Sequence, residues 1–187
     1  MTKINYSISF LTYWHAGSGL TSGTQADSIV IKDENGLPIF PGKTLKGVFR
    51  DAFKSLKDSN LLGEMDEIRL FGQENNPGNN ELKEGSLFFS NAELPERESL
   101  AKSKNLIPAL YDTLASTEIN QVSGVAEKGS LRVIEICVPL NLSGTISGFK
   151  SGDEAEEFTK VFAFTKALGG HRNRGLGRCV IQKTAIQ

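Results

Sequence analysis

The order of two helical patterns among strand patterns constrains the fold of this chain more than any other feature. Residues 43–57 and 153–168 each repeat apolar side chains at the i, i+3, i+4 and i+7 spacing of a helix with one buried face. Short apolar or alternating segments typical of strands flank both helices, at 4–12, 86–93, 131–138, 142–149 and 178–186. The order β–α–β, an excursion, then β–α–β predicts an α+β chain with the ferredoxin-like βαββαβ fold that RNA-recognition domains share.

The segments between these elements are predicted to be loops of different kinds. Residues 13–28 are rich in Gly, Ser and Thr, and their length favours a functional segment over a simple connector. A hairpin-like stretch over 29–40 turns at its Asp-Glu-Asn-Gly sequence. Residues 60–84 are predicted to be irregular, with a mobile loop tip at 75–80. Gly169 is expected to cap the second helix.

Length and composition predict one domain, residues 1–187, with an inserted segment at 94–130. Hydrophobic residues make up 39% and charged residues 23% of the 187 positions, which is ordinary for a globular domain with a real core. The formal net charge of −1 argues against a nonspecific polycation, so a nucleic-acid surface would have to be local. The acidic residues away from the basic segments are interpreted as helix-start charges and solvated helix faces: Glu64, Asp66, Glu67, Asp153, Glu154, Glu156 and Glu157.

Cysteine usage and the amino terminus point to the cytoplasm. Cys137 and Cys179 lie in apolar strand patterns and are predicted to be buried free thiols, and two cysteines are too few for a Cys-based zinc site. The first residues lead straight into a strand pattern without a signal peptide, and no apolar run approaches the ~20 residues of a membrane span. We therefore expect a cytoplasmic protein with no membrane partner.

A glycine- and arginine-rich run at 169–178 is the strongest functional signal. Its sequence is Gly-Gly-His-Arg-Asn-Arg-Gly-Leu-Gly-Arg. Glycines permit positive φ and close approach to a ligand, successive N–H groups can form an anion-binding nest, and arginines add planar phosphate donors. A helix cap followed by a solvated basic turn is the alternative. The predicted RNA-binding residues of this run are Gly170, His171, Arg172, Arg174, Gly175, Gly177 and Arg178.

A second basic element with glycines, Pro-Gly-Lys-Thr-Leu-Lys-Gly at 41–47, opens the first helix. Lysine and arginine recur along one stripe of this helix, beside its apolar face. A solvated face is one interpretation; phosphate contact near the helix start is the other. Two phosphate-suited elements in one small chain favour RNA as the ligand, with Lys43, Lys46, Arg50 and Lys54 as further candidate contacts.

Several motifs spread over the chain occur together. They are Trp-His-Ala-Gly-Ser-Gly at 14–19, Asp27, the run 36–50, Leu-Phe-Gly at 70–72, Phe-Phe-Ser-Asn-Ala at 88–92, the segment 117–132 and the glycine run at 169–178. In this combination the sequence resembles the RAMP superfamily of CRISPR-associated proteins over most of its length, and within it the backbone subunits of type III effector complexes. It departs from the family in the pair Gly169-Gly170, which replaces a glycine–apolar–glycine sequence.

The resemblance implies an architecture and partners. It implies a ferredoxin-like palm with an inserted β-hairpin thumb around 117–132, assembling along a CRISPR guide RNA for antiviral defence. Complementary target RNA, other RAMP subunits and a large subunit of the effector complex are the further partners implied. In such assemblies the basic helix and the glycine loop would hold guide phosphates, and the thumb would kink the guide–target duplex.

Asp27 is the candidate catalytic and metal-binding residue. The resemblance implies that an aspartate at this loop position supports cleavage of target RNA with Mg²⁺ or another divalent cation. From the residues alone, an aspartate before an apolar strand is more often a turn former or cap. One carboxylate is a thin metal site, but magnesium takes many of its oxygen ligands from water and phosphate.

His15 is the alternative catalyst, because an imidazole can act as acid or base toward a 2′-hydroxyl. A histidine that orders its loop, or one that contacts RNA, is the other interpretation. Three functions therefore remain: a guide-binding backbone subunit that is also a metal-dependent endoribonuclease, the same subunit without cleavage, and a metal-independent guide-processing endoribonuclease using His15. The lysine-flanked signature at 41–47 favours a backbone subunit.

Overall fold

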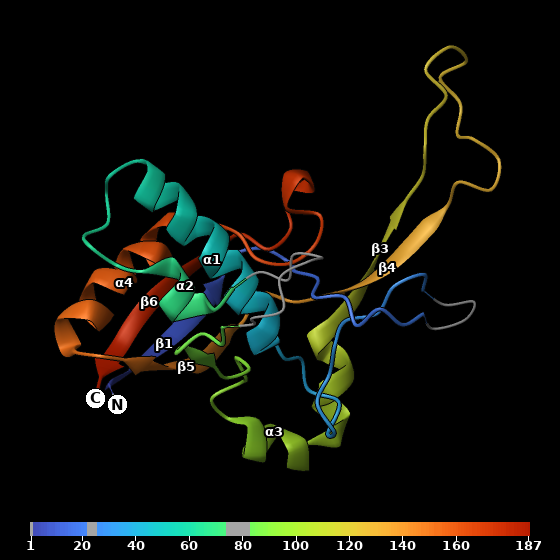
Figure 1. The fold of residues 1–187 in the computed structure, drawn as a ribbon. Helices are drawn as coiled ribbons and strands as arrows, with labels where there is room; N and C mark the ends of the chain where they lie inside the picture. The colour runs from blue at the N-terminus through green and yellow to red at the C-terminus, as the bar shows by residue number, and fades with distance from the viewer. Residues whose placement is uncertain (1, 22–25, 74–82) are drawn as a thin grey trace.

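The computed structural model describes residues 2–21, 26–73 and 83–187. Its centre is an antiparallel sheet in the order β2-β5-β1-β6, formed by β1 (Thr2–Phe10), β2 (Phe88–Phe89), β5 (Asn141–Phe149) and β6 (Cys179–Ile186). The two long helices, α1 (Gly42–Asp58) after β1 and α4 (Gly152–Phe164) after β5, cover one face of this sheet (Figure 1). We call this unit the palm. Its chain order and strand order are those of the predicted ferredoxin-like βαββαβ fold, which is confirmed.

The core lies between the sheet and the two helices. In β1 the alternate residues Ile4, Tyr6 and Ile8 are buried, while the residues between them are only half-buried. Phe49 of α1 and Phe162 of α4 meet the Tyr6 ring at centroid distances of 6.3 and 5.5 Å. Aromatic packing thus joins both helices to the central strand of the palm.

A second sheet projects from the palm. β3 (Tyr111–Ser116) and β4 (Arg132–Cys137) pair in antiparallel register, with Tyr111 opposite Cys137 and Ser116 opposite Arg132. Residues 117–131 continue beyond them as a long hairpin loop that points away from the palm (Figure 1). We call residues 111–137 the thumb; its paired strands extend the hairpin that the motifs placed at 117–132.

Two short helices, α3 (Arg97–Lys102) and η1 (Lys104–Leu110), connect the palm to the thumb. They fall within the segment expected to be a polar insertion, and α3 buries none of its residues. The predicted strand over 86–93 is shorter than expected. Only β2 forms a ladder, and it is followed by single bridges between Phe40 and Ala92 and between Glu93 and Ser143.

The region 60–84 contains a helix where the sequence predicted irregular structure. Helix α2 (Glu67–Phe71) has five residues, too few to show a helical period in the sequence. Its signal is the cap, because the Asp66 carboxylate accepts hydrogen bonds from the amides of Ile68 and Arg69. The loop tip predicted at 75–80 lies outside the described residues.

Helix α4 ends at Phe164, earlier than the predicted end at residue 168. Thr165 has an extended backbone, and its hydroxyl donates to the carbonyl of Val161. Gly169 therefore does not cap this helix. Its φ of 93° lies in the left-handed region, which favours glycine at this position.

Two acidic residues that were expected on solvated faces are instead partners of arginines. Glu67 accepts from Arg50 of α1 at 2.6 Å, and Glu154 of α4 is paired with Arg69 of α2. Their side chains are 23% and 14% exposed, so these pairs help to fasten α2 to the two long helices. Both residues lie in the first turn of their helices, so the prediction of helix-start charges is confirmed for them, whereas the alternative of a solvated face is wrong.

An aromatic stack marks the junction between palm and thumb. Trp14 is fully buried and stacks on Phe10 with ring centroids 4.5 Å apart. Its indole Nε1–H donates to the carbonyl of Val138 at 3.1 Å, and its main chain exchanges two hydrogen bonds with Cys137 at the end of β4. The end of β1 and the root of the thumb are thereby fixed together.

Both cysteines are buried free thiols, as predicted. Burial raises the pKa of Cys137 to about 12 and that of Cys179 to about 11. Among the helices in the described part of the chain, none has the length and apolarity that crossing a bilayer would require.

Candidate nucleic-acid interface

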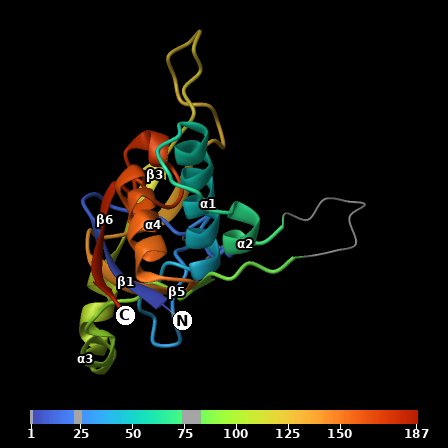
Figure 2. The same cartoon turned by 60° about the vertical axis from the view of Figure 1, so that its left-hand side comes forward.

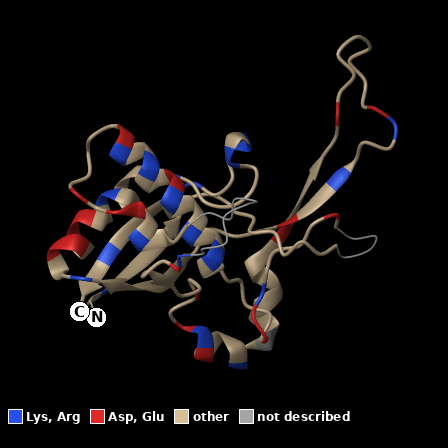
Figure 3. Cartoon of the chain, in the orientation of Figure 1, with Lys and Arg blue, Asp and Glu red and all other residues tan. Residues whose placement is uncertain are grey.

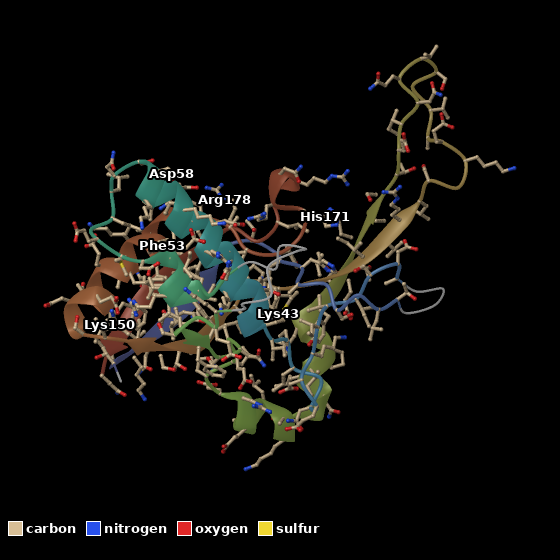
Figure 4. The ribbon with its side chains drawn as sticks, in the orientation of Figure 1. Lys43, Phe53, Asp58, Lys150, His171 and Arg178 are labelled. Carbon is tan, nitrogen blue, oxygen red and sulfur yellow. The ribbon has the colours of Figure 1, made fainter. Side chains whose placement is uncertain are left out.

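The predicted site residues gather mainly at one end of the palm. The glycine loop (167–178), the segment after β1 and the root of the thumb meet there, while both chain termini lie at the opposite end (Figure 1). Figure 4 shows His171 and Arg178 in the glycine loop and Lys43 at the start of α1. Figure 3 shows basic residues on α1 and on the turn of the glycine loop, and acidic residues concentrated on α4.

The glycine loop is held by main-chain hydrogen bonds at both of its ends. Leu168 N–H donates to the carbonyl of Gly177 at 2.9 Å, which closes the loop on itself. Gly177 N–H donates to the carbonyl of Tyr13, and Gly170 N–H donates to that of His15, at 2.7 and 2.8 Å. These bonds fix the base of the loop against the segment after β1, so the basic turn is presented from a rigid support.

Glycine is needed at the base of this loop for close approach. At Gly177, which has φ 74°, a Cβ atom would overlap the carbonyl oxygen of Leu168. At Gly169 it would overlap the carbonyl oxygen of His15. At Gly175, which has φ 87°, nothing lies within 4 Å, so only the turn conformation there favours glycine.

The tip of the loop is a short 3₁₀ turn, η2 (Arg172–Arg174), with exposed basic side chains. His171 precedes it in the left-handed region, with φ 56° and ψ 27°. Its pKa lies below the usual histidine value, first because of partial desolvation and then because of the neighbouring His15 and Arg174. Arg178, directly before β6, is also exposed.

The basic stripe of α1 does not continue into the glycine loop. Lys46 lines a hollow of about 460 Å³ with Gly72 and Lys83, on the side of α1 that faces α2. Arg172 instead lines a hollow of about 220 Å³ with Asp51, on the other flank of α1. Figure 2 shows α2 and the glycine loop on opposite sides of α1. The two predicted phosphate-binding elements therefore lie on separate flanks.

Part of the stripe is occupied by structural contacts. Arg50 donates from Nε to Glu67 and from its terminal nitrogen to the carbonyl of Gly72, at 2.6 and 2.9 Å. Lys54 lies 3.6 Å from the same Glu67 carboxylate. Lys43 is exposed in the first turn. A Cβ atom on Gly42 would overlap the carbonyl oxygen of Phe89, so this glycine allows α1 to pack tightly against β2.

His15 is 4% exposed, and both of its ring nitrogens are engaged. Nδ1 is 2.6 Å from the carbonyl oxygen of Glu135 in β4, and Nε2 is 3.1 Å from the hydroxyl of Ser28. Together with the bond from Gly170 to its carbonyl, these contacts make His15 a bridge between glycine loop, thumb root and the Asp27 segment. In this arrangement no ring nitrogen faces solvent to exchange a proton with RNA.

Asp27 is exposed beside β4 of the thumb. Its N–H donates to the carbonyl of Val133, and its carboxylate oxygen Oδ2 accepts from the N–H of Val133, both at 2.7 Å. Ser28 then forms a parallel bridge with Ile134 of β4. The carboxylate is therefore positioned by the thumb strand, and only one of its two oxygens is used by that contact.

Among the described residues, no group of three or more His, Cys, Asp or Glu side chains is arranged to hold a metal ion. Asp27 fits a cation only as one protein ligand of an ion that takes its remaining ligands from water and RNA phosphate. The donor set is thus compatible with a metal that arrives with the nucleic acid.

Three residues of this region were not predicted from the sequence. Glu135, Lys32 and Tyr111 form a contact network that ties the segment after Asp27 to the thumb. The sequence does mark Glu135 as unusual, because its carboxylate interrupts an otherwise apolar strand pattern at 133–138. The other two gave no such signal.

The fold and this site define a palm-and-thumb protein built on a ferredoxin-like domain, with a glycine-rich basic loop at the thumb root. The family model of the RAMP superfamily matches residues 7–180. The chain belongs to the RAMP superfamily.

Solved structures share the fold over nearly the whole chain. A chain of the "Type III-B Cmr-beta bound to cognate target RNA" superposes with a TM-score of 0.73 at 12% identity, covering 97% of this chain and 96% of that chain. A chain of the type III-B Cmr-beta apo state superposes with a TM-score of 0.69 at 15% identity, covering 97% of each. A comparison with curated protein sequences finds no significant match.

Proposed function

We propose that this protein is a guide-RNA-binding backbone subunit of a type III CRISPR effector complex and that it cleaves target RNA complementary to the guide. The observation that carries the proposal is the connection of three elements through His15. Its main chain holds the glycine loop, and its ring contacts β4 of the thumb and Ser28, next to Asp27. Phosphate donors, a projecting hairpin and a carboxylate thus share one rigid base.

The glycine loop supplies the phosphate contacts in this proposal. Its base is fixed by main-chain bonds, so RNA binding has to order the exposed side chains of Arg172 and Arg174 but not the base of the loop that carries them. Arginine binds phosphate through paired planar N–H donors, which hold a backbone without reading its bases. The fold neighbour solved with cognate target RNA supports a role of this kind.

Cleavage rests on Asp27 in this proposal. An exposed carboxylate that is fixed beside β4 of the thumb can hold a divalent cation together with phosphate oxygens of the target. When bound, such a cation supplies positive charge at the scissile phosphate, where the transition state concentrates negative charge. Asp27 contributes the orientation, since the bond from Val133 fixes its Oδ2 atom.

A backbone subunit without cleavage is the second candidate, and one observation favours it. Within residues 2–21, 26–73 and 83–187, Asp27 is the one acidic side chain that is hydrogen-bonded to the β4 main chain, and the Glu135 carboxylate is already occupied by Val30 and Lys32. Guide processing by His15 is disfavoured, because the ring is buried and both nitrogens are engaged.

The test is to produce the protein with the remaining effector subunits and a CRISPR array, purify the complex and identify its RNA. We expect guide RNA of repeat-and-spacer sequence, and cleavage of complementary RNA that stops when EDTA removes divalent cations. A complex that holds guide RNA but leaves the target intact would favour the second candidate. Absence of guide RNA from the complex would contradict the proposal as a whole.

A further inference from the structure

Residues 27–31 pair through isolated bridges on both sides, and we call this segment the inner strand although it forms no continuous ladder. On one side, Ser18 N–H donates to the carbonyl of Ile29, and Ile31 N–H donates to that of Ala16, at 3.0 and 2.8 Å. On the other side, the strand runs parallel to β4 through the bonds between Asp27 and Val133. Asp27 lies at the beginning of this strand, so a shift of the strand along β4 moves the carboxylate.

Glu135 of β4 contacts this strand through both its side chain and its main chain. Its carboxylate oxygen Oε2 accepts from Val30 N–H at 2.9 Å, and Oε1 accepts from Lys32 Nζ at 2.8 Å. Its own N–H donates to the carbonyl of Ser28 at 2.9 Å, and its carbonyl lies 2.6 Å from His15 Nδ1. One residue therefore contacts two alternate positions of the strand, Ser28 and Val30, and the lysine that directly follows it.

The ion pair between Glu135 and Lys32 is itself held in place. Lys32 Nζ lies 3.9 Å from the ring centroid of Tyr111, the β3 residue at the thumb root. The Tyr111 hydroxyl donates to the carbonyl of Gly36 at 2.6 Å, which ties the following turn to the same ring. The side chain of Glu135 is 17% exposed, so its hydrogen bonds are partly shielded from water.

We propose that Glu135 is a positioning residue for Asp27: by bonding Val30 and Lys32 it sets where the Asp27 carboxylate lies along β4 of the thumb. This inference rests on the proposed cleavage function. Removal of the Glu135 carboxylate leaves the Val30 N–H and the Lys32 ammonium without their acceptor, so the inner strand loosens next to Asp27. A misplacement of about 1 Å at a reacting group can lower a rate by about 100-fold.

The first experiment needs neither metal nor RNA. Hydrogen exchange is measured on the purified full chain of the wild type, Glu135→Ala and Glu135→Gln, for peptides covering 27–32. We expect Glu135→Ala to exchange at least about tenfold faster at Val30, since a hydrogen bond to a charged acceptor is lost. Glu135→Gln keeps an acceptor oxygen and should remain near the wild type.

The matched control is Glu157→Ala on α4, at the end of the palm away from the thumb. The Glu157 carboxylate also accepts from one main-chain N–H, that of Gly63, and from one lysine, Lys160. Its removal should accelerate exchange at Gly63 and leave residues 27–32 unchanged. Unchanged exchange at Val30 in Glu135→Ala would overturn the positioning role.

The second experiment measures cleavage in the assembled complex at saturating target. We expect Glu135→Ala to lower the single-turnover rate by about tenfold to 100-fold with target affinity within about twofold, and Glu135→Gln to recover most of the rate. Glu135→Asp keeps the charge but is too short to reach both partners, so it should fall between them. It replaces the alanine variant if that variant does not assemble.

The outcomes separate this inference from the proposed function. If the wild type cleaves, Asp27→Ala does not, and both Glu135→Ala and Glu135→Asp cleave at the wild-type rate, the positioning role is wrong and the proposed function stands. If the wild-type complex itself does not cleave, the proposed cleavage fails, and the hydrogen-exchange result still decides whether Glu135 positions the strand.

Discussion

Asp27 and the segment that His15 contacts both lie beside the thumb, but the two side chains differ in their exposure to solvent. Asp27 is exposed, whereas His15 is buried with both ring nitrogens engaged. We expect Asp27→Ala to lower metal-dependent target cleavage by at least about 100-fold, because a charge-stabilising group at the scissile phosphate is lost. Guide and target affinities should stay equal or rise slightly, since one negative charge is removed. Single-turnover cleavage and filter binding measure the two effects.

His15→Gln is the paired variant, because its amide can still bond to Ser28 and Glu135. It should keep most of the cleavage if the histidine only orders the loops. Normal cleavage with Asp27→Ala in every copy, combined with loss of cleavage in His15→Gln, would contradict the assignment.

His171 offers a prediction on pH. Its pKa is lowered in the free chain, first by desolvation and then by His15 and Arg174, which favours the neutral ring. Bound phosphate favours the imidazolium and should raise this pKa, so guide affinity should increase as the pH falls through the pKa of the RNA-bound form and should level off below the lowered pKa of the free form. NMR titration of the ring with and without RNA measures both midpoints.

His171→Asn is the control variant, because asparagine tolerates the left-handed backbone, and it should remove the increase in guide affinity at low pH. If the pH profile of guide affinity is the same in this variant as in the wild type, His171 does not contact phosphate.

At the scale of elements, the glycine loop provides two glycines whose substitutions can be compared. Gly175 and Gly177 both have positive φ, but only at Gly177 would a Cβ atom meet main-chain atoms. We expect Gly175→Ala to cost about 1–2 kcal/mol of unfolding free energy, the cost of a left-handed alanine. Gly177→Ala should cost about 1–3 kcal/mol more, because it also overpacks the base of the loop. Urea unfolding measures both values; equal costs would show that the loop base can relax.

The thumb hairpin contributes little to the palm. Ile119, Val122 and Val125 are exposed, and Ser116 lies opposite Arg132 where the hairpin leaves the paired strands. Replacement of residues 118–130 by a short glycine linker should leave the thermal midpoint of unfolding almost unchanged. Guide affinity should be largely retained, while the positions of target cleavage should change. Global unfolding of this variant would show that the hairpin belongs to the core.

The elements that could be predicted are those with a strong local period. The alternation in β1 and the apolar stripe of α1 are visible in the sequence because their buried side chains repeat regularly. Helix α2 has only five residues, and the end of α4 depends on a bond from Thr165 to Val161, so neither changes the hydrophobic pattern. Short elements and helix ends are set by individual hydrogen bonds that periodicity does not show.

At the scale of the whole molecule, the two basic elements lie on different flanks of α1. Arg50 and Lys54 share Glu67, whereas Arg172 and Arg174 are exposed on a supported turn. We expect Arg172→Glu with Arg174→Glu to weaken guide binding strongly. The dependence of log Kd on log salt should become shallower by about 1.4, the value for two phosphate contacts on a single strand.

The comparison variants change the net charge of the protein by the same amount, but at other places on its surface. Lys43→Glu with Lys46→Glu should weaken binding less than the arginine pair, because it alters the flank that faces α2. Lys3→Glu with Lys150→Glu should have little effect, because Lys150 lies at the opposite end of the palm (Figure 4) and Lys3 pairs with Ser147 in the strand that leads to it. Equal losses in all three variants would indicate binding governed by net charge alone.

The sequence predicted only in part which residues of the site lie together in the folded chain. Motif resemblance singled out the glycine loop, His15 and Asp27, and the structure connects them through His15 and Ser28. The pairing of Arg50 with Glu67 and the contacts of Glu135 join residues far apart in the chain. Such contacts depend on how the thumb packs against the palm, which no local pattern reports.

Trp14, the only tryptophan of the chain, is buried at the junction between palm and thumb. Tryptophan fluorescence, excited at the red edge of the protein absorption band, therefore reports on this junction alone. Circular dichroism, in contrast, averages over the whole backbone. A blue-shifted emission is expected from the stacked ring in its dry surroundings. If the thumb swings when a duplex binds, the shift of this one emission band follows the movement in real time, without any attached label.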